Sequence, residues 1–174
     1  MGLSGPGGAP PRGATQWGGL SNVPLPVPYL LGIAAAVWLD HRWPSAPTGP
    51  RYVQRLIGWS LAVTGVRLIG RSWTAAIPVK LTNPVLLVTS GPYATSRNPM
   101  YLGWALLQLG TGLVRGSRWM IAAVPVAAAL VHRDVRGEER TLEDAFGEEF
   151  RRYRATVPRY LPRQLSVVRR RAAW

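Results

Sequence analysis

Long apolar blocks without a charged residue constrain this chain more than any other feature of its sequence. The regions 13–39, 98–114 and 119–131 carry no charge, and region 53–70 is apolar apart from two arginines and a few polar residues. Segments of this kind suit the hydrocarbon core of a bilayer, where a helix satisfies all of its own backbone hydrogen bonds. We therefore predict an all-α membrane protein with about four transmembrane helices.

Prolines and charges set the ends of these blocks. Alternate prolines in region 24–28 remove backbone donors, so the first helix should begin near Pro28. The third and fourth blocks are short for a full crossing, and the basic turn 115–118 joins them. We expect a helical hairpin whose second helix continues into the charged region 132–146.

The part of the chain before this hairpin has a mixed character. Arg67 and Arg71 lie four residues apart, on one face of the expected second helix. Either both extend toward the headgroups, or Arg67 faces a polar cavity. Residues 85–93, VLLVTSGPY, combine β-branched residues with a Gly-Pro turn, which favours a strand-like or re-entrant loop at the membrane surface.

The charge of the chain is strongly positive and unevenly distributed. The net charge is +13, and 11 of the 21 basic residues follow residue 132, beyond the last apolar block. This distribution favours a cytoplasmic tail that attracts anionic headgroups, with no nucleic acid as a partner. We expect both termini in the cytoplasm and a multi-pass protein of a bacterial inner membrane.

Composition also divides the chain and limits its chemistry. A Gly- and Pro-rich flexible leader (1–22) precedes a single membrane domain (23–162), and a basic tail (163–174) follows it. The chain has no cysteine and only two histidines, so we expect no metal site.

Acidic residues gather in one short region. Seven of the eight lie between Asp134 and Glu149, and Glu138 and Glu139 follow directly on the last apolar helix. Adjacent residues on a helix point about 100° apart, so these two carboxylates can serve different donors. The alternative is a solvated helix in which Arg140 pairs with Glu143 and Asp144.

A second polar segment, SGPYATSRNPMYLG, occupies residues 90–103. Asn98 before Pro99 is typical of a helix start, with Asn98 as the N-cap and Pro99 at the first helical position. A capped helix start is a sufficient explanation of this sequence. The alternative is that its free N–H groups also form a site for an anion.

Together these two segments resemble the integral-membrane methyltransferase superfamily that contains isoprenylcysteine carboxyl methyltransferases and phospholipid N-methyltransferases. The resemblance covers about residues 85–162. The first segment resembles the family motif G-P-Y-x-x-x-R-H-P-x-Y-x-G, and Asn98 stands where the family usually has histidine, so that no general base is available there. The other segment resembles the family motif E-E-x-x-L-x-x-x-F-G-x-x-[YF]-x-x-Y followed by V-P-R and a closing proline. The matching residues are Gly91, Pro92, Tyr93, Arg97, Pro99, Tyr101 and Gly103 in the first motif, and Glu138, Glu139, Leu142, Phe146, Gly147, Phe150, Tyr153, Val157, Pro158, Arg159 and Pro162 in the second.

The resemblance implies an enzyme that transfers a methyl group from S-adenosylmethionine to a lipophilic acceptor, such as an isoprenylcysteine carboxylate, a phospholipid amine or another small apolar molecule. It places the cofactor between the third and fourth apolar helices and the cytoplasmic C-terminal helical segment, which closes the pocket. Glu138 or Glu139 would bind the cofactor ammonium or ribose, and Arg97 with the helix start after Asn98 would bind its carboxylate. The residues expected to bind the cofactor are Tyr93, Arg97, Asn98, Pro99, Tyr101, Gly103, Glu138, Glu139 and Tyr153, and the candidates for catalysis are Asn98 and Arg159.

Two functions of other kinds also fit the sequence. One is a membrane NADPH-dependent reductase of the sterol-reductase type, whose C-terminal region resembles this one. The other is a non-catalytic membrane adaptor that has kept the fold. Binding of S-adenosylmethionine or of NADPH would distinguish among the three.

Overall fold

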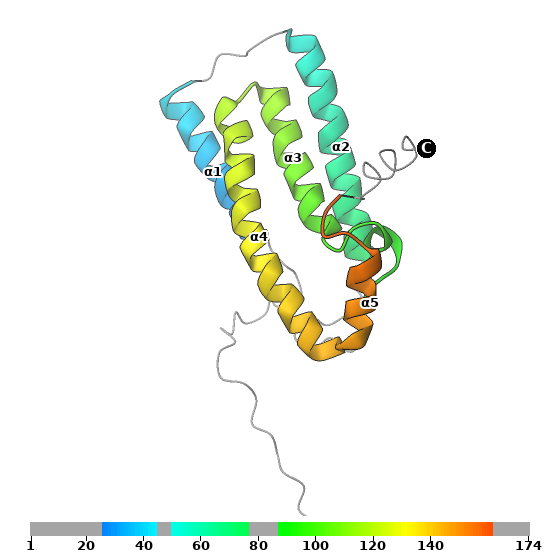
Figure 1. Ribbon diagram of the computed structural model, residues 1–174. Coiled ribbons are helices and arrows are strands. Elements are labelled where there is room, and N and C mark those ends of the chain that lie inside the picture. The colour runs from blue at the N-terminus through cyan, green and yellow to red at the C-terminus, as the bar shows by residue number, and fades with distance from the viewer. Residues whose placement is uncertain (1–25, 45–49, 77–86, 162–174) are drawn as a thin grey trace, which may run out of the picture.

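The computed structural model describes residues 26–44, 50–76 and 87–161, and within these ranges it contains helices and no strand (Figure 1). The all-α class is thereby confirmed for this part of the chain. The expected leader (1–22) and basic tail (163–174) lie outside the described residues. The elements are α1 (Val27–Arg42), α2 (Arg51–Ala76), the 3-10 helix η1 (Gly91–Ala94), α3 (Pro99–Arg115), α4 (Arg118–Phe146) and α5 (Glu148–Thr156).

Four long helices lie side by side, and the short α5 folds back at one end of them (Figure 1). Helix α2 packs mainly on α3, α1 packs on α4, and α3 contacts α4. The bundle therefore has two ends. We call the end with the α3–α4 turn at residues 115–118 the turn end, and the end with η1 and α5 the α5 end.

Glycines allow α2 and α3 to approach closely. A Cβ atom built on Gly110 would lie 2.5 Å from the backbone nitrogen of Ala62, and one built on Gly65 would lie 2.6 Å from the carbonyl oxygen of Gly103. Real Cβ atoms do not come so near to backbone atoms, so any larger residue would push the helices apart. This contact fixes the position of α3 relative to α2.

The predicted hairpin is confirmed. Helix α3 ends at Gly116, whose φ of 72° is left-handed and favours glycine, and Ser117 then caps α4 by accepting a hydrogen bond of 3.0 Å from the backbone N–H of Met120. Helix α4 continues without a break through the charged region to Phe146. At Gly147, with a φ of 52°, the chain reverses into α5.

Helix α2 continues to Ala76, beyond the apolar region 53–70 from which it was expected. Residues 85–93 were expected to form a strand-like or re-entrant loop, and the strand-like form is not found in the described part, where the 3-10 helix η1 begins at Gly91. The cause is that Leu87 is drawn into an apolar cluster with Phe150, Tyr153 and Val157, which holds this segment against α5. Residues 77–86, which include part of the VLLVTSGPY segment, lie outside the described residues.

The four predicted spans are not confirmed. Among the helices of the described ranges, none is both long enough and apolar enough to cross a bilayer.

Candidate functional site

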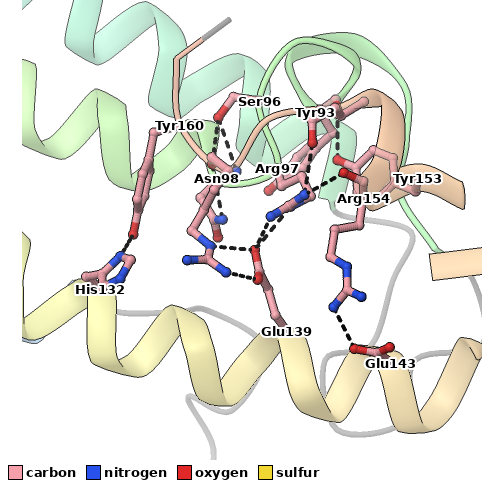
Figure 2. A network of polar contacts seen from close by, with 12 residues as sticks. Tyr93, Ser96, Arg97, Asn98, His132, Glu139, Glu143, Tyr153, Arg154 and Tyr160 are labelled. Atoms are coloured by element: carbon pink, nitrogen blue, oxygen red, sulfur yellow. Dashed lines mark hydrogen bonds and ion pairs between the residues drawn. The ribbon is translucent and has the colours of Figure 1, made fainter. Parts of the chain in front are cut away.

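Glu139 is the centre of a polar network at the α5 end (Figure 2). This residue is 7% exposed and lies on α4. Arg159 donates to both of its carboxylate oxygens, from Nε at 3.0 Å and from Nη2 at 2.6 Å, and Arg97 donates to Oε1 from Nε at 3.1 Å. One buried carboxylate therefore joins the first motif to both parts of the second.

Arg97 is fully engaged with the protein. Its Nη1 donates to the backbone carbonyls of Arg154 at 3.0 Å and Val157 at 2.9 Å. The backbone N–H of Arg97 donates to the carbonyl of Pro158 at 2.9 Å. The Arg97 side chain is 8% exposed. This arginine anchors the loop before α3 to the segment after α5.

Asn98 stands at the predicted N-cap position, and Pro99 follows at the first helical position, but the asparagine side chain makes no capping hydrogen bond. Its Nδ2 donates to the carbonyl oxygen of Arg159 at 3.3 Å, and Ser96 Oγ donates to the same oxygen at 3.2 Å. The predicted side-chain cap was therefore wrong. The hydrogen bond from Asn98 Nδ2 to the carbonyl of Arg159 joins the two motifs. Sequence spacing does not reveal this contact.

An apolar cluster supports this network. Its buried members come from the second motif and from the loop before η1, and the hydroxyl of Tyr153 donates to the carbonyl of Tyr93 at 2.7 Å. Desolvation raises the pKa of Tyr153 to about 12, so its hydroxyl stays protonated as a donor. The cluster comprises Leu87, Phe150, Tyr153 and Val157, with Leu142 and Phe146 packed against them.

Glu138 forms the open edge of the site. The hydroxyl of Tyr101, on the first turn of α3, donates to Glu138 Oε1 at 2.7 Å, and part of the glutamate side chain reaches solvent. The carboxylates of Asp134 and Glu138 lie one turn apart on α4 and close enough to interact. This edge is negatively charged and bordered by a phenol ring.

The environments of Glu138 and Glu139 shift the pKa values of the two carboxyl groups in opposite directions. Desolvation raises the pKa of Glu138, and the charges of Asp134 and Glu139 add to this effect although the Tyr101 hydrogen bond opposes it. Burial would also raise the pKa of Glu139, but hydrogen bonds from Arg159 and the charge of Arg97 outweigh burial and hold that pKa below its usual value. Glu139 is therefore a fixed anion, whereas Glu138 binds its proton more readily.

The contact between His132 and Tyr160 was not expected from the sequence. Nδ1 of His132 lies 3.0 Å from the hydroxyl of Tyr160, and Figure 2 shows this pair beside the Glu139 network. Tyr160 directly follows the V-P-R part of the second motif, and His132 is one of only two histidines in the chain. The rarity of histidine was the one signal that could have drawn attention to this pair.

The remaining predicted residues lie around the start of α3. Pro99 is buried in the first helical turn, and Gly103 lies at the contact with α2, where an added Cβ would come 2.7 Å from Cγ1 of Ile69. The alternative interpretation, a solvated helix, has Arg140 paired with Glu143 and Asp144. In the structure Glu143 instead pairs with Arg151 and Arg154 of α5. Within the described ranges, no three His, Asp or Glu side chains come together as metal ligands would.

Comparison with known families shows which family the chain belongs to. The model of the phospholipid methyltransferase family matches residues 53–149, more than half of the chain, and the chain therefore belongs to this family. The resemblance inferred from the two motifs is confirmed, and the alternative of a reductase is not favoured.

The similar proteins with curated names include a metal resistance protein and several protein-S-isoprenylcysteine O-methyltransferases. The chain is 34% identical over 144 residues to the cobalt-zinc-cadmium resistance protein CzcN of Cupriavidus metallidurans, a match that covers 82% of this chain and 63% of that protein. It is 28% identical over 109 residues to the protein-S-isoprenylcysteine O-methyltransferase of Schizosaccharomyces pombe, covering 61% of this chain and 45% of the relative. The human protein of that name is 36% identical over 77 residues, covering 44% and 27%.

The chain thus spans less than two thirds of the length of each of these relatives. No solved structure is similar enough to count as a match.

Proposed function

We propose that this chain is an S-adenosylmethionine-dependent methyltransferase that acts on a lipophilic acceptor at a membrane. The observation that carries the proposal is the meeting of the two family motifs at Glu139, which orders the start of α3 against α4. This arrangement places Glu138 and Tyr101 together at the open edge of the site.

The residues at this edge fit the charges of the cofactor. S-adenosylmethionine carries an ammonium and a sulfonium, and it supplies an electrophilic methyl group when bound. Glu138, with Asp134 one turn away, offers carboxylate oxygens to the ammonium or to the ribose hydroxyls. The rings of Tyr93 and Tyr101 provide faces that attract a cation.

The contacts of the other predicted residues refine their proposed roles. Glu139 binds the guanidinium groups of Arg97 and Arg159, and Arg97 also donates to backbone carbonyls. We therefore assign Glu139 and Arg97 to positioning rather than to direct contact with the cofactor. Asn98 bonds to a backbone carbonyl. The cofactor carboxylate is then left to the first-turn N–H groups of α3, which the Asn98 side chain does not occupy.

The acceptor that suits these residues best is already ionised at neutral pH. Methyl transfer is an in-line displacement that depends on alignment of the two reactants. Asn98 cannot remove a proton from an amine, whereas a carboxylate needs no base. We therefore favour a carboxylate on a lipophilic molecule, such as a prenylated cysteine, over a phospholipid amine.

A membrane location is part of the proposal. Large apolar side chains are exposed along three of the helices, including Leu31 at 64%, Trp59 at 59% and Val126 at 62%. Contact with lipid would cover such surfaces and would admit a lipophilic acceptor from the side. We propose a multi-pass protein of a bacterial inner membrane with cytoplasmic termini, whose basic tail meets anionic headgroups.

Transfer of a labelled methyl group tests the proposal. Full-length protein in detergent, given S-adenosylmethionine labelled in the methyl group, should label a farnesylcysteine analogue more strongly than phosphatidylethanolamine. Glu138→Gln should abolish most of this transfer. Glu149→Gln removes the same charge from an exposed position without an ion pair to a described residue and should leave it unchanged. Labelling of neither acceptor would count against the proposed activity, and labelling of the amine alone would reverse the acceptor assignment.

A further inference from the structure

A cationic hollow lies at the turn end of the bundle, remote from the Glu139 network. Its volume is about 80 Å³, and its charged lining consists of Arg51 and Arg55 of α2 and Arg115, the last residue of α3. Arg51 and Arg55 are one helical turn apart, so they share a face of α2. Backbone and side-chain atoms of Gln54, Leu113, Val114 and Gly116 complete the lining.

These three guanidinium groups lack an acidic partner among the described residues. None of them forms an ion pair or hydrogen bond with that part of the chain, and no acidic residue lines the hollow. Asp40 is the only acidic residue before residue 134, and it borders a separate hollow that shares Arg115. Three like charges around one small space repel one another, and an anion bound between them would remove this repulsion.

The C-terminus of α3 does not explain why arginine side chains gather at the hollow. Cations gather near helix C-termini when the last carbonyls need partners. Here the carbonyl of Gly112 accepts a hydrogen bond of 2.9 Å from the N–H of Ser117, and that of Leu113 accepts one of 3.2 Å from Gly116. The glycine turn therefore caps the helix without help from an arginine side chain.

The surroundings indicate where the anion comes from. Trp43 at the end of α1 and Tyr52 at the start of α2 are 52% and 78% exposed, and the indole N–H of Trp119 donates to the carbonyl of Trp43 at 3.0 Å. Tryptophan and tyrosine collect at the level of lipid headgroups, where one side of the ring is apolar and the other is wet. The turn end of the bundle, where the hollow lies, thus carries side chains typical of a membrane interface.

We propose that the hollow formed by Arg51, Arg55 and Arg115 binds a phosphate group, and that this phosphate belongs to the headgroup of an anionic phospholipid. Arginine suits this ligand because its planar guanidinium donates two parallel hydrogen bonds to phosphate oxygens. The hollow is lined by the start of α2 and the end of α3, and these lie at the end of the bundle opposite to α5 (Figure 1), where the proposed cofactor site is. The inference rests on the proposed membrane location but not on the proposed methyltransferase activity.

Equilibrium binding to the detergent-solubilised full chain tests this inference. The ligands are short-chain phosphatidylglycerol, short-chain phosphatidylcholine and inorganic phosphate. The test variant combines Arg51→Gln, Arg55→Gln and Arg115→Gln. The control combines Arg133→Gln, Arg136→Gln and Arg140→Gln, which removes the same charge from exposed positions on α4.

Phosphatidylglycerol should bind the parent saturably and more tightly than phosphatidylcholine. The test variant should bind it at least ~10-fold more weakly, because charge-assisted hydrogen bonds are lost, while the control stays within about 2-fold of the parent. Equal losses in both variants, or no saturable binding by the parent, would overturn the inference. Inorganic phosphate that binds as tightly as the lipid would make free phosphate the ligand and refute the lipid source.

If the triple variant does not fold, Arg55→Gln alone should still weaken lipid binding several-fold, and an unchanged affinity in that variant overturns the inference as well.

Discussion

At the scale of single residues, the candidate site depends on how Glu138 and Glu139 divide their contacts. Both lie on α4, and the sequence did not show which of them binds which donor. The structure directs Glu139 toward two arginines and Glu138 toward the hydroxyl of Tyr101. The carboxylate of Glu139 thus holds the two motifs together, and the carboxylate of Glu138 is open to a ligand.

Glu139→Gln should destabilise the fold. The change leaves the buried Arg97 facing a neutral amide, and losing one partner of a buried ion pair costs about 3–5 kcal/mol. We expect the lower end of this range, because the Arg159 side chain is 33% exposed and partly screened by solvent. The free energy of unfolding of both proteins, measured in detergent, checks the prediction.

The difference in free energy of unfolding between the parent and Glu139→Gln should depend on pH, because the pKa of Glu139 is lowered. Its stabilising effect is complete above the usual value of 4.5 and is lost as the pH falls through the lower folded pKa. The parent and Glu139→Gln should therefore converge in stability in strong acid. A difference that is constant over this range would show that the charge of Glu139 is not the cause.

Asn98→Asp should disturb the contact between the two motifs. Asp and Asn are equally good N-cap residues, so the change would be neutral if the side chain capped α3. In the structure its Nδ2 donates to the carbonyl of Arg159, and a carboxylate in that place would repel the same oxygen. Thermal unfolding should show a loss of about 1–3 kcal/mol relative to the parent. An unchanged melting temperature would support the cap instead.

At the scale of helices, the contact between α2 and α3 depends on glycine. Gly110→Ala and Gly65→Ala should each destabilise the protein by about 1–3 kcal/mol, because the new methyl group would meet backbone atoms of the facing helix. Gly70→Ala is the matched control. No atom lies within 4 Å of the site of its new Cβ, so the better helix propensity of alanine should make it neutral or slightly stabilising. Equal effects in all three variants would disprove close packing of these helices.

The sequence predicted some elements well for physical reasons that are local. The α3–α4 hairpin followed from two apolar blocks and the Gly-Ser turn at 116–117, and the start of α3 followed from Pro99. The end of α2 at Ala76 was not expected, although Pro78 disfavours a helical conformation at residue 77 and was a local signal for it. The motif indicated that Arg97, Glu139 and Arg159 matter, but not that they bind one another, since sequence spacing carries no distances across a fold.

At the scale of the whole molecule, the account predicts that the protein associates with membranes. After cell lysis and an alkaline carbonate wash, the full chain should remain in the membrane fraction and leave it only with detergent. The reason is the exposed apolar surface, which includes Trp38 at 62% as well as side chains of α2 and α4. Recovery as a monodisperse monomer in detergent-free buffer would disprove this part of the account.

We propose above all that Glu138 forms part of an S-adenosylmethionine site. Its raised pKa supplies a further test, because only the ionised carboxylate attracts the cofactor ammonium. Cofactor affinity should fall as the pH drops through this pKa, which lies above the usual value of 4.5. Glu138→Gln should bind weakly at every pH and lose this dependence.

The most direct measurement is equilibrium binding of S-adenosylmethionine and of NADPH to the detergent-purified parent, Glu138→Gln and Glu149→Gln at neutral pH. The account predicts that the parent and Glu149→Gln bind S-adenosylmethionine equally, that Glu138→Gln binds it about 10–150-fold more weakly through loss of a charge-assisted hydrogen bond, and that NADPH does not bind. Binding of NADPH without S-adenosylmethionine, or an equal affinity of all three proteins for S-adenosylmethionine, would contradict it.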